Sequence, residues 1–246
     1  MDSLGHGRFI IQINDFQMFI EQMMNLSNAG NKSRFIYRGH RQSQWKLLST
    51  FARSGKSESD LEKHRQNFIE AIAGRRGINP ERLDDNKLWA LGQHFGLKTP
   101  FLDWSTSPYV ALFFAFAEPN ENKYSGNRTV FALNVKRLDE SHVKKDNPST
   151  GLEVIKEISD ENHRMRSQGG LFTRIKPLEM DIETWIINNF PMEYLHSTII
   201  RFEFDENLRE GILRQLDWMN VNYLSLFPDI HGSALHVNIK LEVPDY

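Results

Sequence analysis

The sequence has no cysteine in its 246 residues. A chain without thiols forms no disulfide framework and carries neither a thiol nucleophile nor a thiolate metal site, which fits a reducing compartment. The sequence also lacks a signal-like start, and it lacks any window near the roughly 18 apolar residues that a membrane helix needs. We therefore expect a cytoplasmic protein with no membrane among its partners.

An excess of charge of one sign is also missing. Lysine and arginine number 30 against 32 aspartate and glutamate, which gives a net charge of -2. This balance excludes the large positive field that confers bulk affinity for nucleic acids, but it does not exclude a local basic groove. The hydrophobic fraction of 39% and the charged fraction of 25% are typical of a folded globular protein.

The common signatures of nucleotide-binding and hydrolytic enzymes are absent as well. The chain contains no G-x-G-x-x-G, no Walker loop, no G-x-S-x-G and no kinase signature. Their absence excludes the nucleotide-binding and hydrolase classes that these motifs define. It has no H-E-x-x-H, and His231 and His236 are five residues apart, a poor spacing for one helical face. We expect no metal site.

What is present is an interleaved pattern of strands and helices, which predicts one α+β domain over residues 1–246. Alternating or short apolar runs predict strands at Arg8–Ile13, Arg34–His40, Thr99–Trp104, Thr129–Val135, Gly170–Ile175 and Ser197–Phe204. Helix starts are expected at Asn14 with Gln17, at Ser59 with Glu62, at Asp84 or Asp85, and near Asp181, Asp205 and Asp229. The polar run Lys136–Gly151 is expected to be a loop.

The segment Thr99–Glu118 is the most informative part of the chain. Its helix Tyr109–Ala117 is apolar on every side, so we expect it to be buried in the centre of the fold. Ser105 or Ser107 can cap this helix, and Pro108 stands where a first helical turn tolerates proline.

Several polar residues stand within apolar runs and are therefore candidates for a functional site. Arg38 ends a strand beside Gly39, and its planar, always charged guanidinium suits a phosphate or carboxylate. Pairing with a structural carboxylate such as Asp103 is the alternative role. Asp103 and Ser105 lie at a strand-to-helix junction, where side chains and free backbone N–H groups favour anionic ligands.

Each of the other candidates also has a purely structural alternative. His94 is either an imidazole available for proton transfer or a satisfied histidine at the core boundary. Gln168 either presents an amide to a ligand or simply follows a turn into a strand, and Ser105 is either a ligand contact or a helix cap.

Taken together, these motifs resemble the FRG domain family. The resemblance rests on Tyr37-Arg38-Gly39, on Leu91–Ala115 with its sequence LGQHFGLKTPFLDWSTSPYVALFFA, on Ser167–Thr173 and on Leu226–Gly232. It implies a single FRG domain over residues 1–246. One departure is Pro100-Phe101, where many members carry Arg-Leu.

The order of these motifs is also similar, more distantly, to the ADP-ribosyltransferase fold, which implies a mixed or antiparallel sheet core with surrounding helices. In this comparison Arg38 corresponds to the first-strand arginine that holds the NAD pyrophosphate and ribose, and Ser105 to the first serine of an STS motif. Gln168 stands near the third position, where the transferases usually carry glutamate.

This second resemblance implies an NAD-consuming enzyme, a bacterial toxin or defence effector that modifies a nucleic acid or a protein. Because glutamine carries no charge, Asp103 would supply the carboxylate that stabilises the developing positive charge on the ribose. His94 or His40 would carry the proton or contact the ribose, and Trp104 would stack on a ring unless it is a core residue.

The resulting expectations fall into two sets. The catalytic set is Arg38, His94, Asp103, Ser105 and Gln168, and the NAD-binding set is Arg38, His40, Gln93, Trp104 and Ser105. Two alternatives remain open at this point: a nucleotide-binding module without turnover, and a nuclease or hydrolase that uses Asp103, His94 and Gln168.

Overall fold

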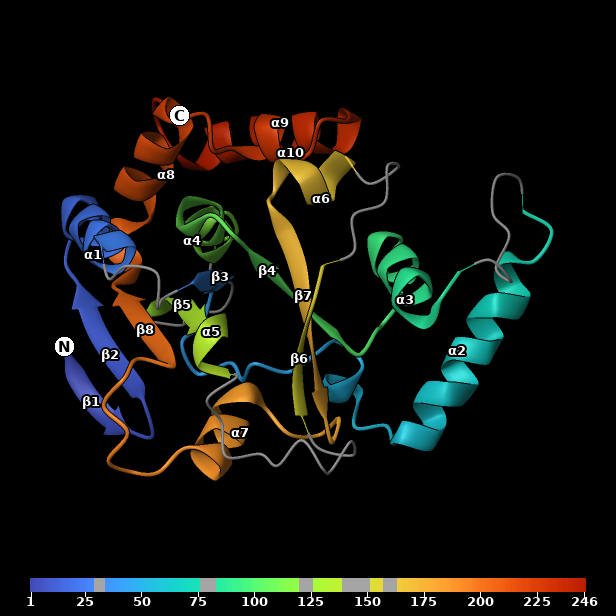
Figure 1. The fold of residues 1–246 in the computed structure, drawn as a ribbon. Coiled ribbons are helices and arrows are strands. Elements are labelled where there is room, and N and C mark those ends of the chain that lie inside the picture. The colour runs from blue at the N-terminus through green and yellow to red at the C-terminus, as the bar shows by residue number, and fades with distance from the viewer. Residues whose placement is uncertain (29–33, 76–82, 120–125, 139–150, 157–162) are drawn as a thin grey trace.

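The fold is built on one mixed sheet. A computed structural model describes residues 1–28, 34–75, 83–119, 126–138, 151–156 and 163–246 (Figure 1). Within these ranges eight strands pair in the order β1-β2-β8-β5-β3-β4-β7-β6. The strands are β1 (Asp2–Gly5), β2 (Arg8–Ile13), β3 (Phe35–His40), β4 (Phe101–Ser105), β5 (Arg128–Asn134), β6 (Gly151–Ile155), β7 (Gly170–Lys176) and β8 (Ile199–Phe204). All neighbours are antiparallel except β2 and β8, which confirms the expected α+β class with a mixed sheet.

Helices cover both faces of this sheet. The α-helices are α1 (Phe16–Asn28), α2 (Glu58–Ile72), α3 (Asp85–His94), α4 (Pro108–Phe116), α5 (Val135–Leu138), α6 (His163–Ser167), α7 (Ile182–Asn189), α8 (Arg209–Trp218), α9 (Tyr223–Leu226) and α10 (Ile230–Glu242), with short 3-10 turns at Ala52–Ser54 and Glu206–Leu208. One core packs α1, α4, α8 and α10 against the sheet, and a second packs α7 against the opposite face. A smaller cluster joins α3 to β4 and β7 through Trp89, Phe101 and Phe172.

Helix α4 lies at the centre of the larger core, as its wholly apolar sequence predicts (Figure 1). Its backbone approaches β3 at Gly39, where an added Cβ would lie 1.9 Å from the carbonyl oxygen of Ala111 and 2.6 Å from the amide nitrogen of Ala115. Only a residue without a side chain allows this contact. Gly39 therefore fixes the distance between the helix and the strand that carries Arg38.

Both ends of α4 are satisfied by specific side chains. At the start, Ser107 accepts a hydrogen bond from the amide of Val110, and Pro108 occupies the first turn, as expected. At the end, Arg128 donates to the carbonyl oxygens of Ala115 and Glu118, and Arg209 donates to those of Phe116 and Ala117. These bonds supply partners to carbonyl groups that a buried helix end leaves without intrahelical partners.

The two arginines are themselves paired. The guanidinium of Arg128, which is fully buried, is bidentate to the carboxylate of Glu206 at 2.5 and 2.7 Å. Arg209 pairs with Glu242 at 2.7 Å. A buried charge that lost such a partner would cost several kcal/mol, so these pairs hold the end of α4 in one place.

Two of the helix starts predicted from the sequence were wrong. Asp15, rather than Asn14, accepts the amide of Met18 and begins α1. The capping box of α2 is Ser57 with Asp60, not Ser59 with Glu62. Helix starts at Asp84, Asp181 and Asp229 are confirmed.

The segment Lys136–Gly151, expected to be a loop, begins inside α5 and ends in the first residue of β6, while residues 139–150 lie outside the described part of the chain. The strand β1 was not anticipated, because its DSLG sequence has no apolar alternation.

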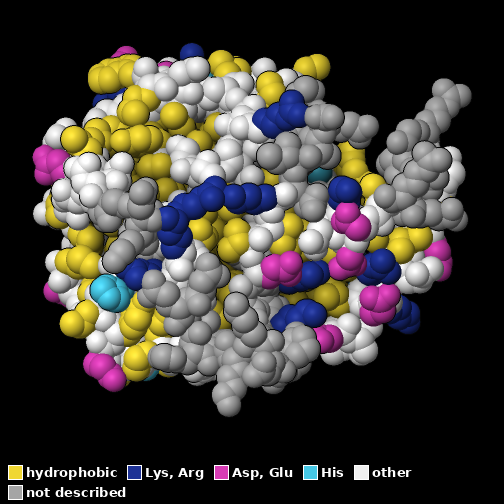
Figure 2. Space-filling model, viewed as in Figure 1, with side chains coloured by type: hydrophobic (Ala, Val, Ile, Leu, Met, Phe, Trp, Pro, Cys, Tyr) yellow, Lys and Arg dark blue, Asp and Glu magenta, His cyan; other side chains and the backbone are white. Residues whose placement is uncertain are grey.

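Charged side chains of both signs share the face seen in Figure 2. On the side of α2 and α3, acidic and basic groups are interspersed. Arg65 pairs with Asp85 at 2.7 Å, and Arg174 pairs with Asp85 and Glu153 at 3.0 Å each. Among the described residues, no helix has the length and apolar character needed to cross a membrane.

Replacing Gly39 with alanine tests the central packing contact. Because the new methyl group would overlap the backbone of α4, we expect Gly39→Ala to lower the free energy of unfolding by about 3 kcal/mol or more, measured by urea denaturation. Gly211→Ala in α8 is the matched control, since nothing lies within 4 Å of its Cβ position. The control should change stability by less than about 1 kcal/mol. An unfolding midpoint of Gly39→Ala equal to that of the native chain would contradict this account.

Candidate functional site

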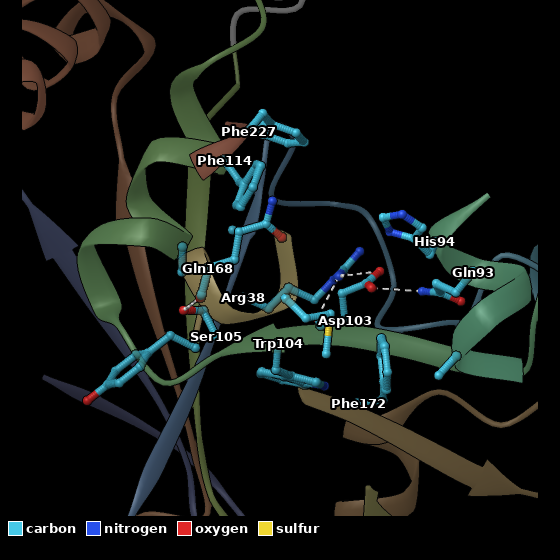
Figure 3. Close-up of a pocket in the computed structure, with 15 residues that line it drawn as sticks. Arg38, Gln93, His94, Asp103, Trp104, Ser105, Phe114, Gln168, Phe172 and Phe227 are labelled. Atoms are coloured by element: carbon cyan, nitrogen blue, oxygen red, sulfur yellow. Dashed lines mark hydrogen bonds and ion pairs between the residues drawn. The ribbon is translucent and has the colours of Figure 1, made fainter. Parts of the chain in front are cut away.

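A pocket of about 360 Å³ lies where β3, β4, α3 and α4 meet. Figure 3 shows polar side chains entering it from several elements. Its lining residues are Tyr37, Arg38, Gly39, Ala90, Gln93, His94, Asp103, Trp104, Ser105, Ala111, Phe114, Met165, Gln168, Phe172 and Phe227. All five residues expected to be catalytic are in this set, so segments far apart in the sequence do converge.

The pocket exists because the sheet opens between β3 and β4. These neighbouring strands share a single antiparallel pair, Tyr37 with Ser105, whereas β3 pairs with β5 along its whole length. In a continued ladder Gly39 would face Asp103. Instead, the carbonyl oxygen of Asp103 accepts a hydrogen bond of 2.7 Å from the guanidinium of Arg38. A side chain thus replaces the backbone pairing at the point where the strands separate.

Arg38 is held on two sides. Its Nε donates to Nε2 of His40 at 3.0 Å, and its Nη1 donates to the backbone of Asp103 and lies 3.8 Å from the carboxylate oxygen Oδ2 of the same residue. Nη2 makes no hydrogen bond to any other described residue. Burial lowers the pKa of Arg38 and Asp103 opposes that change, but an arginine stays charged in either case.

The carboxylate of Asp103 is held from the other side by α3. Gln93 donates from Nε2 to Oδ1 of Asp103 at 2.8 Å, and its own amide oxygen accepts a hydrogen bond from the hydroxyl of Thr99. The second bond fixes which end of the amide faces the carboxylate. The Asp103 side chain is 57% exposed, so its charge is accessible from the pocket.

Ser105 is already committed to structural hydrogen bonds. Its hydroxyl donates to the carbonyl oxygen of Gln168 at 2.6 Å and accepts from the amide of Ser107 at 2.9 Å, and its side chain is almost completely buried. It therefore ties β4 to the segment before β7 and to the start of α4. The amide nitrogen of Gln168 in turn donates to the carbonyl oxygen of Leu226 at 3.2 Å.

Aromatic rings form much of the pocket wall. Phe114 is an exposed residue of the otherwise mostly buried α4, and its ring is edge-on to that of Phe227 at a centroid distance of 6.0 Å. Trp104 lines the pocket but is 3% exposed and donates its indole N–H to the hydroxyl of Thr173 at 2.9 Å. Trp104 thus has the core position that was its alternative role.

The two candidate histidines occupy different places. His94, near the end of α3, lines the pocket, and its ring is edge-on to Phe95 at 4.8 Å. His40 is 3% exposed and is not among the lining residues, because it lies behind Arg38 on the same face of β3. Burial, followed by the charge of Arg38, lowers the pKa of His40 to about 2, so its ring is neutral.

Sequence reasoning missed the hydrophobic half of the pocket. The members not anticipated are Ala90, Ala111, Phe114, Met165, Phe172 and Phe227. Phe114 stands in an apolar helix that reads as core throughout, so nothing in the pattern distinguishes it. Phe227 lies within Leu226–Gly232, one of the segments that resemble the FRG domain. That resemblance was the signal that could have identified it.

Part of the pocket lies in a segment that matches the model of a known family. A family model described as the FRG domain matches residues 33–124. The resemblance to the FRG domain is thus confirmed over residues 33–124. The matched part includes the Tyr37-Arg38-Gly39 motif, Gln93, His94 and the β4–α4 junction, which together form most of the polar wall. No curated protein and no solved structure matches the chain.

Four residues that line the pocket lie beyond the end of the FRG match: Met165, Gln168, Phe172 and Phe227. Of these, Gln168 and Phe227 complete the wall opposite α3. Among the described residues, no group of three or more histidine, aspartate or glutamate side chains is placed to hold a metal ion.

The neutral state of His40 predicts how stability depends on pH. Its pKa of about 2 in the folded chain lies below the value of 6.5 expected when unfolded, so the unfolded chain binds the proton first. Stability should therefore fall as the pH drops below about 6.5, by up to ~1.4 kcal/mol per pH unit from this group. His40→Gln removes the titrating group, so the stability difference between the two proteins should shift in favour of the variant on acidification. Urea denaturation between pH 7 and 4.5 measures it, and parallel profiles would refute a neutral His40.

Proposed function

We propose that this pocket binds NAD and that the protein transfers ADP-ribose from it to a macromolecular acceptor. The observation that carries the proposal is the convergence of a guanidinium, one carboxylate, an imidazole and an aromatic wall in a single pocket. An ordered charge pair beside apolar rings suits a ligand that combines phosphates, a ribose and a planar base. The distant resemblance of the motif order to the ADP-ribosyltransferase fold supports the same reading.

The binding part of the proposal follows from the donors and rings that remain available. Nη2 of Arg38 is unused by other described residues and is suited to a pyrophosphate oxygen. Phe114 and Phe227 offer apolar surface to a planar ring. A volume of about 360 Å³ is near the lower end of the range for small-molecule sites, so one nucleotide half of NAD would occupy it.

The chemical part of the proposal depends on Asp103. In the transfer, the bond between the nicotinamide nitrogen and C1′ of the ribose breaks, and the electron pair leaves with nicotinamide. A nucleophilic oxygen or nitrogen of the acceptor bonds to C1′, and its proton passes to His94. Positive charge develops on the ribose during this step, and a fixed carboxylate stabilises that charge more than it stabilises the bound substrate.

Asp103 takes the place that glutamate usually has in the resembling transferases. Gln168, near the corresponding position, carries no charge, and Asp103 is the single acidic residue among the described residues that line the pocket. The hydrogen bond from Gln93 and the nearby guanidinium of Arg38 keep the carboxylate oriented. We further propose that the acceptor is a nucleic acid or a protein, and that the chain acts in the cytoplasm as a toxin or phage-defence effector.

A nucleotide-binding module without turnover is the second candidate. The observation in its favour is that both hydrogen-bonding directions of the Ser105 hydroxyl are used within the protein. A serine whose hydroxyl both donates and accepts within the protein connects structural elements rather than contacting a substrate. In that case the same pocket would hold a nucleotide while nicotinamide stayed attached.

Nicotinamide release from NAD tests the proposal. We expect Asp103→Asn to reduce the rate by about 100-fold or more, because the amide keeps the shape of the side chain but removes its charge. NAD binding should change far less than the rate. Chromatographic measurement of nicotinamide, with and without a lysate as the source of acceptor, gives the rate, and titration calorimetry gives the affinity.

Glu153→Gln is the matched control, since it removes an exposed carboxylate outside the pocket and should leave the rate unchanged. Equal rates for the native chain and Asp103→Asn would refute the role of Asp103. NAD binding with no nicotinamide release under either condition would favour the binding module. Metal-dependent cleavage of DNA or RNA would instead favour the nuclease alternative.

A further inference from the structure

We infer that His40 is a positioning residue that orients the guanidinium of Arg38 so that its free edge faces the pocket. This inference deepens the proposed function and rests on it for the identity of the anion that Arg38 binds. His40 itself is buried and does not line the pocket, so any effect it has on ligands must act through Arg38.

The geometry begins with the two-residue period of a strand. Arg38 and His40 lie two apart on β3, so their side chains lie on the same face of the sheet. The Nε–H of Arg38 reaches Nε2 of the imidazole at 3.0 Å, while Nη1 reaches the carbonyl oxygen of Asp103 at 2.7 Å. A planar group held at two of its nitrogens has a fixed plane and a fixed direction. The nitrogen left over, Nη2, is the one without a partner among the described residues.

The imidazole is itself held in place by aromatic rings. Its ring is edge-on to Phe131 at 5.1 Å and to Trp45 at 6.1 Å. Phe131 is fully buried in the neighbouring strand β5. His40 therefore supplies its acceptor from a rigid position in the sheet rather than from a flexible surface side chain.

The protonation state of His40 agrees with this role. An imidazole accepts a hydrogen bond at Nε2 only when that nitrogen carries no proton. The depressed pKa of His40 keeps the ring neutral at ordinary pH, with burial as the larger cause and Arg38 as the second. The proton is then on Nδ1, and Nε2 is available to Arg38.

A preoriented guanidinium binds an anion more tightly than a free one, because less rotational freedom is lost on binding. An arginine whose Nε acceptor were removed would keep its charge but lose its orientation. The expected signature is weaker anion binding with no change in net charge at the pocket. A purely structural role for His40 would instead change stability and leave the affinity of the folded protein unaltered.

The experiment compares four variants of the full chain by titration calorimetry, with inorganic pyrophosphate as the probe. His40→Leu removes the acceptor and should weaken binding roughly 10-fold, as expected for one hydrogen bond to a charged group. His40→Gln places an amide oxygen near the position of Nε2 and should restore most of the affinity. Arg38→Ala should abolish the Arg38 contribution, and the double variant Arg38→Ala/His40→Leu should bind no more weakly than Arg38→Ala alone. Circular dichroism confirms that each variant is folded.

The outcomes separate this inference from the proposed function. Unchanged affinity in folded His40→Leu, equal losses in the leucine and glutamine variants, or additive losses in the double variant would each overturn the positioning role. Should His40→Leu fail to fold, His40→Phe, which keeps a ring beside Phe131 but has no acceptor, and its double variant with Arg38→Ala decide the matter by the same comparison. Absence of pyrophosphate binding by the native chain would also overturn it. Pyrophosphate binding with the expected pattern but without nicotinamide release would overturn only the transferase activity.

Discussion

The close approach of α4 to Gly39 is the contact on which the rest of the structure depends. It places an entirely apolar helix against the middle of the sheet, where no side chain fits between the two backbones. A helix buried this deeply needs partners for its end groups, and Ser107, Arg128 and Arg209 supply them. The position of α4 then determines where Phe114 and the serines at its start lie relative to β3.

The pocket is a consequence of how β3 and β4 part beside this helix. After the pair Tyr37 and Ser105 the ladder stops, and the Arg38 side chain bonds to the exposed carbonyl group of Asp103 instead of a backbone amide. The arginine thus gives this carbonyl group the partner that strand pairing no longer supplies. The same residue that closes this gap on one side presents Nη2 on the other. Under the proposed function, the structure of the opening and ligand recognition thus depend on the same guanidinium.

Much of this arrangement was accessible from the sequence. The burial of most of α4 follows from its lack of a polar face, and the caps at Asp84, Ser107 and Asp229 follow from their residue types. The convergence of Arg38, His94, Asp103, Ser105 and Gln168 was also anticipated, because polar residues interrupting apolar runs tend to gather at strand ends.

Other features depend on tertiary geometry that no local pattern encodes. His40 was expected in the binding site, but it is buried against Phe131, hydrogen-bonds to Arg38 and does not line the pocket. The hydroxyl of Ser105 is used because the segment before β7 lies across it, which the sequence around Ser105 does not indicate. Phe114 lines the pocket beside Phe227, which comes from a segment more than 100 residues away. Each case arises from a neighbour distant in the chain.

A structure of the protein with bound NAD would test the central claim most directly. The account predicts that a pyrophosphate oxygen lies within hydrogen-bond distance of Nη2 of Arg38, that C1′ of the nicotinamide ribose faces the carboxylate of Asp103, and that a planar ring lies against Phe114 and Phe227. NAD bound elsewhere on the molecule, or a pocket that stays empty at saturating NAD, would contradict it.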